Sequence, residues 1–353
     1  MELNEIDALI SATYAESDYP VCLSQRKAWS VTRPFARLTV LDATPIFRNT
    51  LVKHRALLAG GARLIVGQPL GIPCDPAIMD LLRRSGIAVV SPSDPQPEPV
   101  DVVLDCAASF LHWRPRLGAV ELTRSGVPKY DANGMPVFVA DSSRIKKIET
   151  CLGTGESFFR AMHQLGYTDW KGKKLVIFGS GKVGTGLLSY AVLSGARATV
   201  VTEPSSVTDF VREKATEIVA CQDVQAVART LLDAHAVVTA TGVADALSHP
   251  IVTQALLQSD ALLANMGVED EYGNGIPTQR VLSDKRPLNF ILDEPTHLRY
   301  IDATMGLHNE GINYLLAHPT ERGLVEPPLA LEEQLLGITR RDGTIGDEVD
   351  QMV

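Results

Sequence analysis

Short apolar runs and stretches of helical spacing alternate along the first part of the chain. The apolar runs, which are typical of strands covered on both faces, occur in ARLTVLDAT, ARLIVGQP, IAVVS, DVVLDCA and PVFVADS. Helical spacing occurs in PIFRNTLVKHRALLAGG, which ends at Gly60 and Gly61, and in DPAIMDLLRRSG, where Asp75 is the predicted N-cap and Gly86 the stop. This order predicts a parallel sheet with helices on its faces.

The same alternation starts again near Cys151. GTGESFFRAMHQLG has helical spacing, KLVIF is a continuous apolar strand, and ATVVTEP, DAHAVVTATG, ALLANMG and NFILDEP are further strand candidates. A chain of 353 residues is long for one compact core. We therefore expect an α/β protein with two Rossmann-like, doubly wound parallel-sheet domains and a cleft between them. The expected boundaries are 1–150 for a substrate domain, 151–310 for an NAD-binding domain, and 311–353 for a segment that returns to the first domain.

Composition excludes several classes of function. The formal net charge is -9 and no dense Lys/Arg run occurs, which argues against a nucleic-acid partner. No apolar run has the length of a membrane span, and the acidic N-terminus lacks the charge pattern of a signal peptide. The five cysteines are widely spaced and form no CxxC pair, so we expect reduced thiols, no metal site and a cytoplasmic location.

The most informative motif is the glycine loop GSGKVGTG that begins at Gly179. It follows the strand KLVIF and precedes a helical stretch, as in dinucleotide-binding sites. Gly179 permits a tight turn, Gly181 lets the backbone approach a pyrophosphate, and Gly184 lets the helix pack on the strand. The next strand ends in Glu203, whose carboxylate can bind the ribose hydroxyls and would repel a 2′-phosphate. This spacing favours NAD over NADP, the alternative being a glycine-rich turn without a ligand.

Two further loops fit a dinucleotide site. Thr241-Gly242-Val243 follows the strand AVVTA, and Asn265-Met266-Gly267 follows ALLA. Both loops are expected at the carboxyl ends of strands, where open α/β sheets bind ligands. Ordinary turn chemistry explains either loop alone equally well.

These motifs resemble the NAD-binding core of the S-adenosylhomocysteine hydrolase family. The resemblance is carried by ETCLGTGESFFRAM, KGKKLVIFGSGKVGTGLLSYAVLSGARATVVTEP, TATG, LLANMGVEDE and MGLHNEG, and it extends loosely over residues 35–318. In that family, bound NAD+ oxidises a ribose hydroxyl, a thioether is eliminated, water adds and the hydride returns. The motifs and the resemblance together predict these cofactor-binding residues: Gly179, Ser180, Gly181, Lys182, Val183, Gly184, Glu203, Thr241, Gly242, Asn265, Thr123 and Ser125.

Positions that are catalytic in the family hold other residue types in this chain. Asp42 stands where the family has a histidine, Glu149 where it has an aspartate, and Val268 where it has a second histidine. The family also ends in a Lys/Tyr tail, whereas this chain ends in GDEVDQMV. The resemblance therefore implies a diverged member that retains the cofactor and acts on another small molecule. Since the family is oligomeric, it also implies a homo-oligomer.

Hydride transfer needs a base near the hydroxyl group that loses its proton. Lys146 and the adjacent Lys147 precede the second domain, so either can serve, or both can be solvated surface lysines. His308, in MGLHNEG, matches a histidine of the family and is either a base, a polar orienting group or a structural histidine.

Four acids and thiols complete the candidates. Asp42 binds substrate or caps the helix that is expected to begin at Pro45. Glu149 holds a substrate hydroxyl or pairs with the neighbouring lysines. Cys106 is a weaker candidate, because a cysteine at the end of an apolar strand is more often buried and inert. Glu121 is a weaker candidate of the same type as Asp42 and Glu149.

Three functions are compatible with these residues. The first is an NAD-dependent oxidoreductase for a hydroxyl- or keto-bearing small metabolite. The second is a thioether hydrolase of the family type that uses substitute residues. The third is a non-catalytic NAD-binding regulatory protein.

Overall fold

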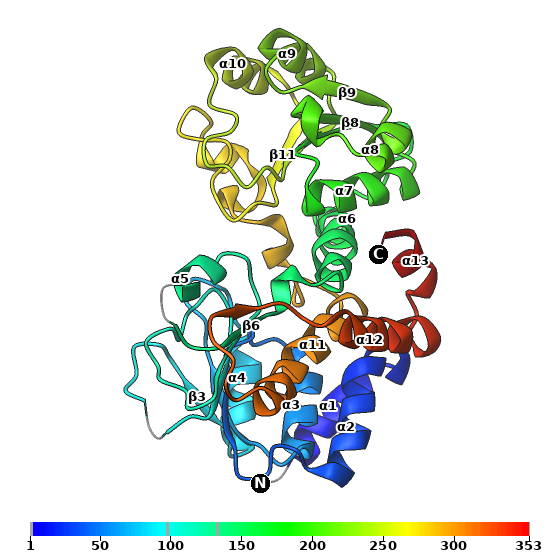
Figure 1. Cartoon of the computed structure of the whole chain (residues 1–353). Helices are drawn as coiled ribbons and strands as arrows, with labels where there is room; N and C mark the ends of the chain where they lie inside the picture. Colours follow the sequence, from blue (N-terminus) through cyan, green and yellow to red (C-terminus); the bar gives the residue numbers. More distant parts are fainter. Residues whose placement is uncertain (1–2, 97–98, 132–133, 353) are drawn as a thin grey trace. The chain divides into compact units, whose positions relative to one another are not determined.

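The computed structural model describes residues 3–96, 99–131 and 134–352, and the chain divides into two compact units. The first unit comprises residues 1–148 and 297–353, and the second comprises residues 149–296. In Figure 1 the blue-to-cyan and orange-to-red segments make up the first unit, and the green and yellow segments the second. The second unit is therefore inserted into the first.

The first unit is built on a parallel sheet with the strand order β12-β6-β5-β4-β1-β2-β3. The chain runs from β1 outward to β3, then returns to β4 on the other side of β1. This reversal places a topological switch point between β1 and β4, where open α/β sheets bind ligands. The strands are β1 (Thr39–Asp42), β2 (Arg63–Gly67), β3 (Ala88–Val90), β4 (Val102–Asp105), β5 (Gly118–Glu121), β6 (Val137–Val139) and β12 (Leu324–Val325).

The helices of the first unit come from both parts of the chain that form it (Figure 1). They are α1 (Asn4–Thr13), α2 (Pro20–Thr32), α3 (Thr50–Ala59), α4 (Pro76–Arg84), α5 (Val127–Asp131), α11 (Leu298–Ala317), α12 (Leu329–Asp342) and α13 (Gly346–Met352). The prediction for α4 is confirmed, because Asp75 Oδ1 accepts hydrogen bonds from the N–H groups of Ala77 (2.8 Å) and Ile78 (3.4 Å).

Helix α11 belongs to the first unit, although the boundary was expected at residue 310. It contacts β5 and helices α2 and α3. Asp302 accepts hydrogen bonds from the N–H groups of Val21 (2.7 Å) and Cys22 (3.0 Å) at the start of α2. Gly311 lies so close to Val120 of β5 that a Cβ would be 2.6 Å from that side chain. These contacts explain why the second unit ends at Thr296.

The second unit has a parallel sheet with the order β11-β10-β7-β8-β9, so its switch point lies between β7 and β10. Its strands are β7 (Lys174–Phe178), β8 (Arg197–Thr202), β9 (Glu217–Ala220), β10 (Ala236–Thr239) and β11 (Leu262–Asn265). Its helices are α6 (Thr154–Gln164), α7 (Lys182–Leu193), α8 (Asp209–Lys214), α9 (Val224–Leu232) and α10 (Pro250–Gln258). Two doubly wound parallel sheets confirm the predicted fold class.

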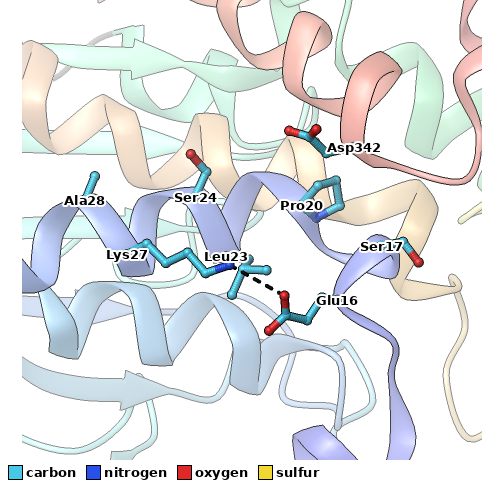
Figure 2. Close-up of a pocket in the computed structure, with 8 residues that line it drawn as sticks. All are labelled: Glu16, Ser17, Pro20, Leu23, Ser24, Lys27, Ala28 and Asp342. Carbon is cyan, nitrogen blue, oxygen red and sulfur yellow. Dashed lines mark hydrogen bonds and ion pairs between the residues drawn. The ribbon is translucent and has the colours of Figure 1, made fainter.

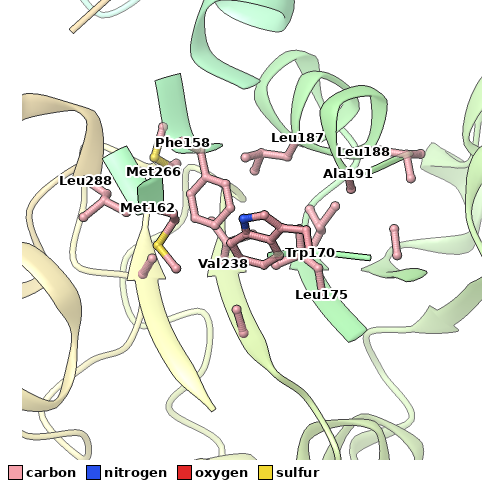
Figure 3. Close-up of a cluster of buried hydrophobic side chains, with 14 of the residues drawn as sticks. Phe158, Met162, Trp170, Leu175, Leu187, Leu188, Ala191, Val238, Met266 and Leu288 are labelled. Atoms are coloured by element: carbon pink, nitrogen blue, oxygen red, sulfur yellow. The ribbon is translucent and has the colours of Figure 1, made fainter. Parts of the chain in front are cut away.

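Apolar residues of α6, α7 and the sheet form one core of the second unit. Figure 3 shows Phe158 and Met162 of α6, Leu187 of α7, and Val238 of β10 around Trp170. Trp170 is buried, and its Nε1 donates a hydrogen bond to the Tyr167 carbonyl (3.1 Å). Burial of this apolar surface fixes α7, and with it the loop that precedes α7, against the sheet.

The sequence-based assignment of elements was wrong at several places. NFILDEP is not a strand: its first residues belong to the short 3-10 helix Leu288–Ile291. A brief apolar run does not distinguish a strand from a turn. Strands β5, β9 and β12 were not predicted. Helix α3 begins at Thr50 rather than Pro45.

Candidate functional site

The glycine loop connects β7 to α7 at the switch point of the second unit. Gly179 has a φ of +101°, and a Cβ there would lie 2.5 Å from the carbonyl oxygen of Ala240, which follows β10. Gly184 packs directly on the Gly179 carbonyl. By contrast, a Cβ on Gly181 would meet no heavy atom within 4 Å. The loop is therefore closed toward the protein and open at Gly181, as the approach of a pyrophosphate requires.

The other predicted loop residues have distinct positions. Ser180 is buried, and its hydroxyl bonds the Thr202 hydroxyl (2.7 Å) and the Ser206 carbonyl (3.1 Å). Val183 packs against the core, whereas the side chain of Lys182 is exposed. Gly181 is the N-cap of α7, whose first-turn amides lack intrahelical acceptors and can bind anionic groups. Ser180 thus anchors the loop, and the backbone provides the anion site.

Glu203 lies exposed at the carboxyl end of β8, the strand beside β7. Its carboxylate accepts hydrogen bonds from the Cys221 thiol (3.3 Å) and from the Gln222 side-chain amide. Both partners follow β9, the next strand of the sheet. Burial, followed by the Glu203 charge, raises the pKa of the Cys221 thiol, so this cysteine is neutral at physiological pH. These two hydrogen bonds thus orient the Glu203 carboxylate at the carboxyl end of β8.

The turn after β10 is held by a residue that the sequence analysis missed. Glu271 is fully buried and accepts hydrogen bonds from Thr241 N (2.9 Å), Thr241 Oγ1 (2.7 Å) and Gly242 N (2.8 Å). Gly242 has a φ of +72°, which favours glycine. Only the acidic character of VEDEYG hinted at this role, since Glu269, Asp270 and Glu271 are equivalent in sequence.

Both amide atoms of the Asn265 side chain, at the end of β11, form hydrogen bonds with other groups of the second unit. Its Oδ1 accepts from Thr239 Oγ1 (2.9 Å) and Gly267 N (2.9 Å). Its Nδ2 donates to the carbonyls of Gly267 (3.1 Å), Glu269 (2.7 Å) and Lys285 (2.7 Å). This amide therefore shapes the loop after β11.

In the first unit, Asp42 ends β1 and is completely buried in an ion pair. Its Oδ2 lies 2.7 Å from Lys53 Nζ and 3.2 Å from His54 Nε2, and both partners belong to α3. Its Oδ1 accepts from Thr44 N (3.0 Å) and Thr44 Oγ1 (2.7 Å). Although burial opposes ionisation, Lys53 and His54 hold the pKa of Asp42 well below its usual range. The predicted helix cap is wrong: Asp42 neutralises a buried lysine and shapes the turn after β1.

His308 lies on α11, close to this pair. It is fully buried, with Nε2 3.0 Å from the Val120 carbonyl and Nδ1 3.5 Å from Thr44 Oγ1. Burial and the nearby Lys53 charge lower its pKa to about 3, so the ring is neutral at physiological pH. This geometry suits an orienting or structural histidine better than a base that exchanges protons with a ligand.

Two buried acids follow the neighbouring strands β4 and β5. Asp105 accepts from Cys106 N (2.8 Å), Phe110 N (3.0 Å) and Tyr130 OH (2.5 Å). Burial and the Glu121 charge raise the pKa of Asp105 to about 7. Burial also raises the pKa of Glu121.

Glu121 organises the turn after β4. It accepts from the N–H groups of Ala107 (3.0 Å) and Ala108 (3.0 Å), which both have a positive φ, 58° and 52°. It also accepts from Thr123 N (2.7 Å) and Thr123 Oγ1 (2.7 Å). Thr123 Oγ1 in turn lies 3.3 Å from Ser125 Oγ. Thr123 and Ser125 are thus part of the turn structure at the carboxyl edge of the first sheet.

Two of the remaining candidates, Lys146 and Glu149, lie where the chain passes from the first unit to the second. Lys146 is buried, with 4% of its surface exposed, and its charge contributes to the lowered pKa of His308. Glu149 is half-buried and lies in the π-helix Ile148–Gly153, which leads directly into α6. Cys106 is buried, in agreement with the expectation of an inert thiol.

An open groove of 480 Å³ lies on the helical surface of the first unit (Figure 2). Its lining comes from η1 (Glu16–Asp18), α2 and the end of α12 rather than from strand ends. The residues are Glu16, Ser17, Pro20, Leu23, Ser24, Lys27, Ala28 and Asp342. Lys27 and Glu16 form an exposed ion pair at 3.5 Å. This groove offers none of the chemistry found at the switch points.

Two general features of the described residues bear on function. Across 3–96, 99–131 and 134–352, no three or more His, Cys, Asp and Glu side chains are placed to hold a metal ion. No helix in the described part of the chain has the length and apolar character needed to cross a membrane.

Comparison with known proteins agrees with the geometry of the second unit. The family model described as "Putative NAD(P)-binding" matches residues 167–275, the range that contains the glycine loop, Glu203 and Thr241–Gly242. The second unit is thus an NAD(P)-binding domain. No curated protein matches the sequence.

Solved structures give one informative likeness. The dipicolinate synthase subunit from Bacillus halodurans is 11% identical and superposes with a TM-score of 0.50, over 80% of this chain and 98% of that chain. At this identity the likeness shows a shared fold. A "putative alcohol dehydrogenase" from Thermotoga maritima is 19% identical over 34% of this chain and 33% of that chain, with a TM-score of 0.28.

Proposed function

We propose that this chain is an NAD-dependent oxidoreductase that acts on a hydroxyl- or keto-bearing small metabolite. The observation that carries the proposal is the Glu203 carboxylate, which stands at the end of β8 beside the glycine loop. A carboxylate at this position accepts hydrogen bonds from both ribose hydroxyls and repels a 2′-phosphate. NAD is therefore the preferred cofactor.

The residues present fit this cofactor. Gly181 leaves open space where a phosphate approaches, and the first-turn amides of α7 supply hydrogen-bond donors. Thr241 and Gly242 lie on the other side of the switch point, where the second half of a dinucleotide would bind. When bound, NAD supplies the capacity to accept or donate a hydride.

The chain itself must supply the proton transfer. Lys146 is our proposed base, because it is buried and its charge contributes to the lowered pKa of the neighbouring His308. His308 would then orient neighbouring groups rather than exchange protons. We expect Lys146→Met to abolish turnover while NADH binding is retained, and Lys147→Met to leave both unchanged.

A non-catalytic NAD-binding role is the second candidate, and a specific observation favours it. Asp42, Asp105 and Glu121 all end strands at the carboxyl edge of the first sheet, yet each accepts hydrogen bonds from groups of the same unit. Acids engaged in this way shape the turns of their own unit, which is a structural role.

Binding and turnover distinguish these functions. Calorimetry with NADH and NADPH tests the cofactor, and equal affinity for both would contradict the assignment of Glu203. A panel of hydroxy and keto metabolites, followed by NADH absorbance, tests the oxidoreductase. Thiol release from S-adenosylhomocysteine would instead identify a hydrolase, and NADH binding without turnover would favour the second candidate.

A further inference from the structure

The turn after β10 depends on one buried carboxylate. Glu271 is fully buried, and its two oxygens accept three hydrogen bonds from Thr241 and Gly242, at 2.7 to 2.9 Å. Within the described residues, these donors are two backbone N–H groups and a hydroxyl. Hydrogen bonds to a charged acceptor are about twice as strong as neutral ones. Three hydrogen bonds therefore tie the Glu271 carboxylate to the turn.

The neighbouring acids are not equivalent to Glu271. Asp270 is directed to Lys285, whose Nζ lies 2.9 Å from Asp270 Oδ2 and 2.6 Å from the Gly273 carbonyl. Glu269 has an exposed side chain, and its carbonyl accepts from Asn265 Nδ2. Asn265 and Lys285 thereby fix the backbone around residues 265–273, and this backbone directs the Glu271 side chain toward Thr241.

The turn held by Glu271 also touches the glycine loop. The Cβ position of Gly179 lies 2.5 Å from the Ala240 carbonyl oxygen and 3.2 Å from Thr241 Cα. The two turns that flank the switch point are thus in direct contact. Glu203 lies on the opposite side of the glycine loop, at the end of β8.

We propose that Glu271 is a positioning residue that holds the Thr241–Gly242 turn in the shape that receives the nicotinamide half of the cofactor. The proposal rests on the proposed function, since it takes NAD as the ligand. Glu203 and the glycine loop recognise the adenosine half and the phosphates, on the β8 side of the switch point. Glu271 bonds only the turn on the β10 side, so its influence is confined to the nicotinamide half of the cofactor.

The test compares two ligands, NADH and AMP, on the full-length protein. Glu271→Gln keeps the size of the side chain but places an NH2 group against donors, which leaves a buried N–H unsatisfied. We expect NADH affinity to fall roughly tenfold or more, while AMP affinity stays within about twofold. Glu217→Gln, the same change at an exposed glutamate at the start of β9, should alter neither.

A second variant covers the case in which Glu271→Gln does not fold. Thr241→Val removes the hydroxyl donor to Glu271 while preserving the shape of the side chain, and we expect a smaller loss of NADH affinity. If both variants fold, the double variant should lose less than the product of the two single effects, because the residues act through one contact.

The outcomes separate the two hypotheses. If the unmodified protein binds AMP and NADH equally weakly, with no gain from the nicotinamide half, the proposed function fails. If the unmodified protein binds NADH but Glu271→Gln and Thr241→Val bind it equally well, only the role of Glu271 is refuted. An equal loss of AMP and NADH affinity would show a general structural role and would also overturn the inference.

Discussion

The buried ion pair of the first unit leads to a quantitative prediction for Lys53→Met. Both Lys53 and Asp42 are fully buried, and Nζ lies 2.7 Å from Oδ2. The methionine fills similar space but leaves Asp42 without its lysine. Removing one partner of a buried pair typically costs about 3–5 kcal/mol. Since Thr44 still donates two hydrogen bonds to Oδ1, we expect about 3 kcal/mol.

The loss should be visible in the first unit alone. Trp29 and Trp113 are buried in that unit, and Trp170 lies in the second, so a Trp170→Phe background restricts tryptophan fluorescence to the first. Urea unfolding in this background should show the lower free energy of unfolding, while NADH affinity is unchanged. A loss of about 3 kcal/mol is a large share of the roughly 5–15 kcal/mol that stabilises a typical domain.

A double variant separates charge from packing. In Lys53→Met combined with Asp42→Asn, the asparagine oxygen can still accept from Thr44, and no uncompensated charge is buried. We expect the double variant to be more stable than Lys53→Met alone by about 1–3 kcal/mol. If Lys53→Met costs less than about 1 kcal/mol, or if the two changes are additive, the argument from charge neutralisation is refuted.

Three further predictions concern the strand ends and the glycine loop. Glu203→Ala should weaken NADH and AMP binding about tenfold each and reduce the preference over NADPH, as measured by calorimetry; unchanged affinities would remove Glu203 from the site. Because the pKa of Asp105 is raised from 3.8 to about 7 on folding, protonation favours the folded state. Its contribution is complete below about pH 4 and is lost as the pH rises to about 7. Urea midpoints of the first unit should therefore fall between about pH 4 and 7, and should fall less in Asp105→Asn. Gly184→Ala places a methyl group against the Gly179 carbonyl, so the free energy of unfolding should fall by about 1–3 kcal/mol and NADH binding should be lost. A stable variant that still binds NADH would contradict the close packing.

The glycine loop could be predicted from sequence because its determinants are local. Gly179, Gly181 and Gly184 lie within one strand–turn–helix unit, so their spacing can be read from a short stretch of sequence. The doubly wound fold followed in the same way from the order of apolar runs. NFILDEP was misassigned because a short apolar run is compatible with a strand or a turn, and its tertiary surroundings decided the outcome.

The acids at the strand ends could not be assigned from sequence, because their partners are distant or belong to common residue types. Asp42 pairs with Lys53, and the helical spacing of PIFRNTLVKHRALLAGG does not distinguish Lys53 from a surface lysine. His308 bonds the backbone carbonyl of Val120, which no side-chain pattern reports. Glu271 was hidden among three acids, and only the direction of the loop distinguishes it from Asp270.

The insertion of one unit into the other has a consequence for synthesis on the ribosome. The NAD(P)-binding unit, residues 149–296, is synthesised in full before α11, β12 and α12 of the first unit. Domains generally fold as units when their residues become available. We therefore expect the NAD(P)-binding unit to acquire its native structure first. The N-terminal part of the first unit must wait for α11, because His308 of α11 contacts Thr44 and Asp302 of α11 bonds the start of α2. A chain truncated after residue 296 should thus be able to bind cofactor while its N-terminal region remains sensitive to protease.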